Sequence, residues 1–271
     1  MGSHFAASAE RVLAWAFATL VLGSAVRHAC AVAKAQHAVN VLCLGSAAQG
    51  ALPAGVPTAQ ACLTSDPNTT VAKAQAKTLS AEAAKCDPMQ LPNFAYEGGA
   101  VVNAAAVSEP IGLVEDLFGA DLDAAVRPKA TDKPGARCQK NVLTATQKLS
   151  DRLYKATFKE KKLLLAGKDD GTLARSDAVL QMLLTEFLIA DASGGIAAQE
   201  SAVRTAVRES CTPAILDAAF PGCAPSATSN EMASCAIGHA RCRYCRGFNA
   251  FDGLAIDCDT FDDEIANASC P

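Results

Sequence analysis

The side chains best suited to chemistry lie near the end of this 271-residue chain, where cysteines surround one histidine. Cys235, His239, Cys242 and Cys245 have three, two and two residues between them, and they offer the donors of a tetrahedral Cys3His zinc site. Covalent haem attachment is excluded, because Arg246 rather than a histidine follows the CxxC motif. A thioredoxin-like redox pair is disfavoured, because no βαβ pattern surrounds the motif. Zinc binding is therefore one candidate function of this region.

A run of carboxylates a few residues further on is a second candidate metal site. Calcium prefers hard oxygen ligands, and several carboxylates close in sequence can supply them. The run lacks the glycine turn and the terminal glutamate of an EF-hand loop, and acidic residues also favour the first turn of a helix. A calcium site and a charged helix start therefore both remain open for Asp257, Asp259, Asp262, Asp263 and Glu264.

Disulfide bonds compete with both metal sites for the same region. Twelve cysteines in one chain are typical of an oxidising compartment and not of the reducing cytosol. The tail holds an even set of six. We therefore expect a disulfide framework there, and the sequence does not choose the pairing among Cys223, Cys235, Cys242, Cys245, Cys258 and Cys270.

The N-terminus agrees with export of the protein. Arg11 precedes an apolar run over residues 12–23, which has the length of a signal-peptide hydrophobic region and is too short to span a bilayer. Cleavage after Ala25 would keep all twelve cysteines. We therefore expect a signal peptide over residues 1–25 and a mature chain that is secreted, periplasmic or on the cell surface, without a transmembrane span.

The composition favours an all-α fold. Half of the residues are hydrophobic but only 5% are aromatic, so the core must consist mainly of Ala, Leu and Val, which suits closely packed helices. A net charge of −4 gives no electrostatic reason to expect nucleic-acid binding. The chain has no GxSxG elbow, P-loop, dinucleotide fingerprint or HExxH motif, so catalysis is not expected.

A divergent repeat divides the chain. Residues 62–86 align with residues 187–211 at a constant offset of 125, so that Asp66 meets Asp191 and Cys86 meets Cys211. In each copy the pattern predicts three helices. The second and third helices are separated by a turn, DPNTT or DASGG, whose Asp can cap the helix that follows.

The repeat also predicts disulfides. The second copy keeps equivalents of the outer two cysteines and lacks both inner ones, because Cys62 is replaced by Phe187 and residues 139–210 contain no cysteine. Loss as a pair indicates bonding as a pair. The expected disulfides of the two copies are Cys30–Cys86, Cys43–Cys62 and Cys138–Cys211.

These observations predict five segments along the chain. Between the copies, apolar stretches at 100–107 and 111–118 are broken by Pro110 and Gly119, which favours two short helices followed by an exposed linker. The expected organisation is a signal peptide over 1–25, a helical module over 26–92, a connection over 93–136, a second helical module over 137–212 and a cysteine-rich helical region over 213–271.

The segments FGADLDAAV, DPNTTVAKAQAK and CRYCRGFNAFDGLAIDCDTFDDEIANASC resemble secreted, Ala- and Cys-rich proteins of deltaproteobacteria and myxobacteria. The resemblance covers most of the mature chain. It implies an extracytoplasmic helical protein and assigns no catalytic residues. We therefore expect a structural, surface or binding role, with a cell-surface partner or self-assembly, and no cofactor apart from calcium. The alternatives are a calcium- or zinc-binding module and an enzyme of unrecognised mechanism.

Overall fold

The described part of the chain is all-α, as the composition predicts. The computed structural model describes residues 28–85, 95–166, 174, 176–263, 265 and 270, and these contain helices and turns but no β-strand. The expected signal peptide, Cys86 and Glu264 lie outside the described residues. None of the described helices is by itself long and apolar enough to cross a membrane. The helices over Asp177–Ala190 and Gly195–Ser210 together have sufficient length and apolar character, but they are bent by 55°.

The helices follow one another with short connections. The described chain begins with a helix over residues 28–48. After it come α2 (Ala59–Ser65), α3 (Thr70–Lys85), α4 (Gly99–Phe118), α5 (Leu122–Ala125), α6 (Lys133–Ala166), α7 (Asp177–Ala190), α8 (Gly195–Ser210), the 3-10 turn η1 (Pro213–Ile215), α9 (Leu216–Ala219), the 3-10 turn η2 (Pro221–Cys223), α10 (Ser229–Asp252) and α11 (Cys258–Asp263).

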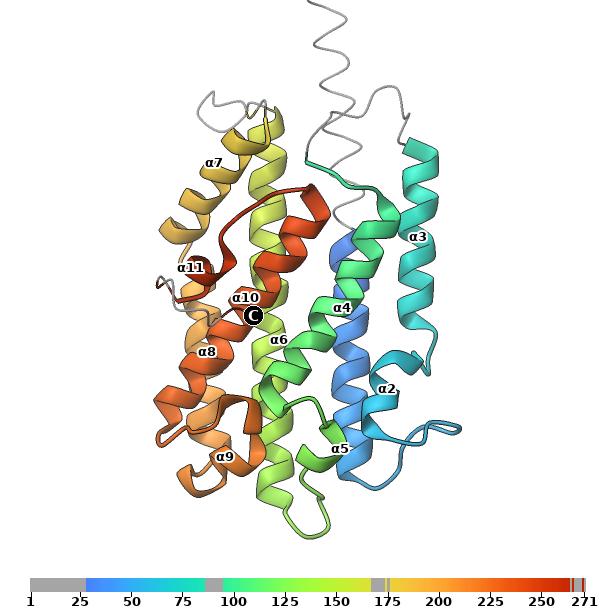
Figure 1. Cartoon of the computed structure of the whole chain (residues 1–271), viewed down its shortest axis with the longest axis vertical. Helices are drawn as coiled ribbons and strands as arrows, with labels where there is room; N and C mark the ends of the chain where they lie inside the picture. Colours follow the sequence, from blue (N-terminus) through green and yellow to red (C-terminus); the bar gives the residue numbers. More distant parts are fainter. Residues whose placement is uncertain are drawn as a thin grey trace, which may run out of the picture.

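Two long helices organise the packing. The 34-residue α6 runs along most of the molecule, with the helices of the first half on one side and α7 and α8 on the other (Figure 1). Helix α6 packs most extensively on α8, and α10 packs on α4, α6, α8 and α11. The apolar positions of α6 recur at helical spacing, and a stripe of this kind must be buried. The buried stripe of α6 includes Val142, Leu149, Leu153 and Leu164.

The two copies of the repeat share the same turn. Asp66 and Asp191 both end a helix in the left-handed conformation, with φ of 40° and 34°. Asp66 accepts hydrogen bonds from the amides of Val71 and Ala72 at 3.2 and 2.9 Å. Asp191 accepts the corresponding bonds from Ile196 and Ala197 at 3.0 and 2.9 Å. Each Asp therefore ends one helix through its backbone conformation, and its carboxylate caps the next helix, as the aligned sequences predict. The segment boundaries stay a prediction.

The connection between the copies differs from the prediction. The two short helices expected on either side of Pro110 are one helix, α4. Proline lacks an amide, which leaves one helical carbonyl without its usual donor. Packing outweighs that cost: Pro110 is buried, and its own carbonyl accepts a 2.8 Å hydrogen bond from the buried amide of Asn40. Only Gly119 ends the helix, with φ of 79°.

The disulfides of the copies are confirmed in part. Cys43–Cys62 and Cys138–Cys211 are formed as predicted. The predicted Cys30–Cys86 bond is wrong for this structure, because Cys30 is a free thiol. It lies near α6, where burial and then the charge of Asp151 raise its pKa to about 12. The free cysteine is therefore protonated and a weak nucleophile at neutral pH.

The shared turn leads to a stability prediction. Replacing Asp66 by Ala removes the acceptor for the amides of α3. Alanine also disfavours the left-handed backbone at φ 40° more than aspartate does. We expect Asp66→Ala to lower the free energy of unfolding by about 1–2 kcal/mol, measured by urea denaturation. Asp66→Asn is the matched control, because Asn keeps an acceptor oxygen and tolerates this conformation. Equal losses in both variants would contradict the capping role.

Candidate ligand-binding cavity

The predicted zinc ligands do not come together. Zinc requires thiolates, whereas Cys235, Cys242 and Cys245 each form a disulfide with a different partner, respectively Cys223, Cys270 and Cys258. These bonds also settle the tail pairing that the sequence left open. The Cys3His zinc interpretation is therefore wrong for the oxidised protein, because each of its three sulfurs is already bonded to another sulfur.

His239 lies beside a different sulfur pair from the predicted one. Among the described residues, the one set of three or more potential metal ligands whose atoms lie within 4.8 Å of one another is Cys223, Cys235 and His239. Its two sulfurs are those of a disulfide, so they are not available as thiolates. Burial lowers the pKa of His239, and the nearby charge of Asp116 only partly opposes this effect. His239 is therefore a neutral imidazole that lies beside the Cys223–Cys235 disulfide.

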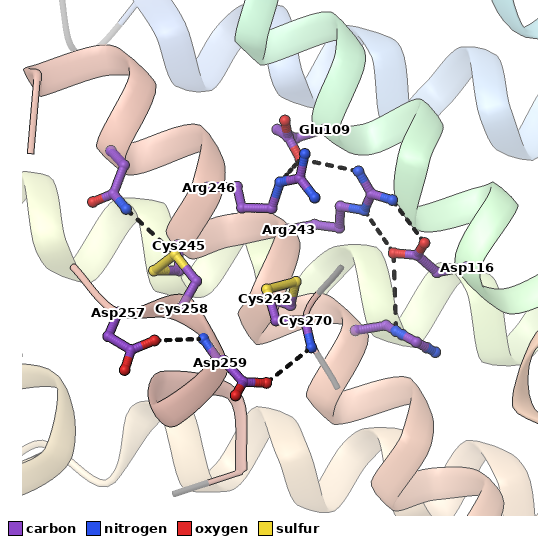
Figure 2. Close-up of a disulfide and its surroundings, with 12 residues drawn as sticks. Glu109, Asp116, Cys242, Arg243, Cys245, Arg246, Asp257, Cys258, Asp259 and Cys270 are labelled. Atoms are coloured by element: carbon purple, nitrogen blue, oxygen red, sulfur yellow. Dashed lines mark hydrogen bonds and ion pairs between the residues drawn. A yellow bond between two sulfur atoms is a disulfide. The ribbon is translucent and has the colours of Figure 1, made fainter. Parts of the chain in front are cut away.

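The acidic run mainly supports the local backbone. Asp257 accepts hydrogen bonds from the amides of Asp259 and Thr260 and from the Thr260 hydroxyl, so it caps α11. Asp259 accepts a 3.3 Å bond from the amide of Cys270, and Asp263 one of 2.9 Å from Ile265 (Figure 2 shows the first two carboxylates). The described members of the run do not converge on one point. These contacts fit a charged helix start. The calcium site stays a prediction, because Glu264 lies outside the described residues.

An ion-pair network that sequence reasoning missed joins α10 to α4. Arg243 donates from Nε and Nη2 to the two oxygens of Asp116 at 2.6 and 2.7 Å, and from Nη1 to Glu109 at 3.4 Å (Figure 2). These hydrogen bonds raise the pKa of Arg243 above its ordinary value. Burial raises the pKa of Glu109, against the opposing charges of Arg243 and Arg246. The bidentate pair fixes the register of the two helices.

A second missed pair lies deeper. Lys161 of α6 donates from Nζ to Asp252 Oδ1 at 2.5 Å and to the carbonyl of Ala95 at 2.6 Å, and both charged side chains are at most 2% exposed. Burial raises the pKa of Asp252 to about 6 despite the lysine beside it. Burial also lowers the pKa of Lys161. Because each group is costly to bury without the other, the pair locks α6 to the end of α10.

A cavity of about 630 Å³ lies where α6, α7, α8, α10 and α11 approach one another. We call it the α7–α11 cavity. Its apolar lining residues are Leu153, Leu188, Ile189, Ile196, Ala197, Ile256 and Phe261. Its polar lining residues are Gln181, Thr185, Asp191, Glu200, Arg241, Asp257 and Thr260. Pockets of about 300–1,000 Å³ with an apolar lining and a few polar groups are typical sites for small molecules.

The walls of the cavity are held by specific contacts. Arg241 donates from Nε and Nη2 to Glu200 Oε1 at 2.9 and 2.5 Å, which joins α10 to α8. The Gln181 amide exchanges two hydrogen bonds with the backbone of Ala255, at 3.1 and 3.2 Å, which joins α7 to the segment before α11. The Cys245–Cys258 disulfide anchors the start of α11 to α10. The cavity therefore has walls that are fixed before any ligand binds.

The sequence gives little sign of this cavity. Of its lining residues, the sequence singles out only Asp257, and it does so as a calcium ligand. The lining comes from five helices between positions 153 and 261, so no local motif marks it. The one available signal was the apolar character of α7, where Met182 and Ile189 remain 53% and 69% exposed.

Comparisons with known proteins do not add to these observations. No family model, curated protein or solved structure matches this chain. The resemblance to secreted, Ala- and Cys-rich bacterial proteins therefore stays a prediction.

The buried Lys161–Asp252 pair predicts a pH-dependent stability defect. Lys161→Met leaves Asp252 buried without its cation, so we expect a loss of about 3–5 kcal/mol at pH 8. Burial raises the pKa of Asp252 and Lys161 opposes this rise, so the pKa of Asp252 is raised further in the variant. Between the unfolded pKa of about 4 and this folded pKa the folded protein binds more protons than the unfolded chain, so its stability falls as pH rises through that range. The defect should therefore be smaller at pH 5 than at pH 8.

Urea unfolding at both pH values measures this defect. The double variant Lys161→Met with Asp252→Asn is the control, because it removes the orphaned charge and should recover most of the loss at pH 8. A single variant as stable as the double variant at both pH values would contradict the account.

The α4–α10 network predicts that Gly112 cannot be replaced. A Cβ at this position would fall on the guanidinium of Arg243, which its acidic partners hold in place. We expect Gly112→Ala to destabilise the protein by about 1–3 kcal/mol in thermal unfolding. Gly238→Ala on α10 is the control: a Cβ there meets nothing within 4 Å, and the gain in helix propensity should stabilise by about 0.5–1 kcal/mol. Two stabilised variants would show that Arg243 moves aside freely.

Proposed function

We propose that this chain is a secreted or periplasmic bacterial binding protein whose disulfide-stapled helical scaffold holds a small molecule in the α7–α11 cavity. The observation that carries the proposal is the cavity itself, about 630 Å³ in volume and lined by both apolar and polar side chains. This combination supports binding of a ligand with an apolar body, because burying that body removes apolar surface from water.

The covalent framework supports the proposed compartment. Five disulfides connect the described helices, and bonds of this kind persist in oxidising surroundings. The bond between Cys245 and Cys258 constrains part of the cavity lining, because Ile256, Asp257 and Thr260 lie within two residues of Cys258 in the chain. Rigid walls favour binding, because less conformational entropy is lost when the ligand enters.

The binding of an uncharged, environment-sensitive probe tests the proposal. We expect N-phenyl-1-naphthylamine to bind the protein saturably at one site, with increased fluorescence. Ala197→Trp should weaken this binding about tenfold or more, because an indole on the first turn of α8 fills part of the cavity. Ala202→Trp is the matched control, since Ala202 is exposed on the same helix and is not among the lining residues. Equal binding by both variants, or no saturable binding by the wild type, would overturn the proposal.

A further inference from the structure

We propose that the ligand of the α7–α11 cavity is a cationic amphiphile, a molecule with an apolar body and an amine head group. The inference rests on the proposed function and adds the charge of the ligand to it. It rests on two observations: acidic residues outnumber basic ones in the cavity lining, and the one basic residue is already paired with a carboxylate.

Acidic groups outnumber basic ones around the cavity. The described lining residues include three carboxylates, those of Asp191, Glu200 and Asp257, and one cation, Arg241. The Arg241 side chain is only about a quarter exposed, and its guanidinium is already paired with Glu200. An anionic head group would therefore meet two unpaired negative charges and a cation that another carboxylate already neutralises. A cationic head group would be attracted, because these charges act across a partly water-excluded cavity.

Two of the carboxylates have fixed positions. Asp191 accepts hydrogen bonds from the first amides of α8; although burial acts in the opposite direction, these bonds lower its pKa below the ordinary value. Asp257 caps α11 in the same manner. A helix N-terminus carries only about half a positive charge, so each Asp leaves a net negative potential at the wall.

Glu200 offers the direct contact for an amine. Both hydrogen bonds from Arg241 end on Oε1, and Oε2 is engaged by no described residue. An ammonium group has three donors and can bond Oε2 while its chain lies along the apolar floor formed by Leu153, Ile196 and Phe261. A bare metal ion fits less well, because the three carboxylates are not among the described groups that converge within 4.8 Å. Carboxylates that lie apart from one another, next to apolar side chains, suit an organic cation better than a metal ion.

A matched series of ligands tests the inference. Octylamine, octanol and octanoate share one chain and differ in the head group, and each can be titrated at pH 7 against the bound fluorescent probe. We expect octylammonium to bind about tenfold more tightly than octanol, the equivalent of one charge-assisted hydrogen bond, and octanoate to bind most weakly. Added salt should narrow the difference between the charged ligands. Equal affinities, or a preference for octanoate, would overturn the inference.

Two variants locate the effect. Glu200→Gln removes the carboxylate and releases Arg241, so the preference should shift from octylammonium toward octanoate. Arg241→Gln removes the cation and leaves Glu200 charged, so the preference for octylammonium should grow. Thermal unfolding of both variants checks that the fold is retained, and either variant alone suffices if the other does not fold. An unchanged preference in a folded variant would contradict the role given to the pair.

The outcomes distinguish this inference from the proposed function. Failure of all three ligands and of the neutral probe to bind would reject the cavity as a binding site. Binding of the probe and of octanol without a preference for the amine would leave the binding function intact and reject the cationic ligand.

Discussion

Helix α10 packs against four other helices, and the rest of the structure depends on this central position. It packs on α4, α6, α8 and α11. Its cysteines form three disulfides along its length: Cys235 bonds to η2, Cys242 to Cys270 and Cys245 to the start of α11. Because three separate segments are bonded to one helix, α10 fixes their positions relative to one another. The tail therefore closes the helical assembly covalently.

Few aromatic residues are available, and they are concentrated where α10 meets α6. Tyr154 and Phe158 of α6 contact Tyr244, Phe248 and Phe251 of α10, with ring centroids 4.9–6.3 Å apart. Elsewhere small residues let the helices lie close together, and charged side chains pack over them. One example is Arg243 of α10, whose guanidinium lies over Gly112 of α4. A core made mainly of Ala, Leu and Val thus brings backbones close together, and its long charged side chains must then find partners inside it.

The sequence was informative where the determining interactions are local. The helices of each copy and the capping turns at Asp66 and Asp191 follow from spacing and turn chemistry, and comparison of the copies identified Cys43–Cys62 and Cys138–Cys211. It was misleading at Pro110, where tertiary packing keeps a helix continuous despite a missing amide. It did not reveal the cavity or the buried Lys161–Asp252 pair, whose members are 91 positions apart. Contacts of that range depend on how helices are placed in space, which residue spacing does not specify.

Part of the cavity lining comes from the second copy, at a place where the two copies differ. In the first copy the middle helix, α2, has seven residues, and Cys62 ties it to the helix over 28–48. In the second copy Phe187 takes the place of Cys62, and α7 is twice as long, packs mainly on α6 and leaves part of its apolar surface exposed. The second copy therefore lacks a disulfide that would hold this helix against its neighbour. The two hydrogen bonds between Gln181 and the backbone of Ala255 hold α7 instead, and the Cys245–Cys258 disulfide holds the start of α11. The lining of the cavity thus combines non-covalent contacts of the second copy with a covalent bond of the tail.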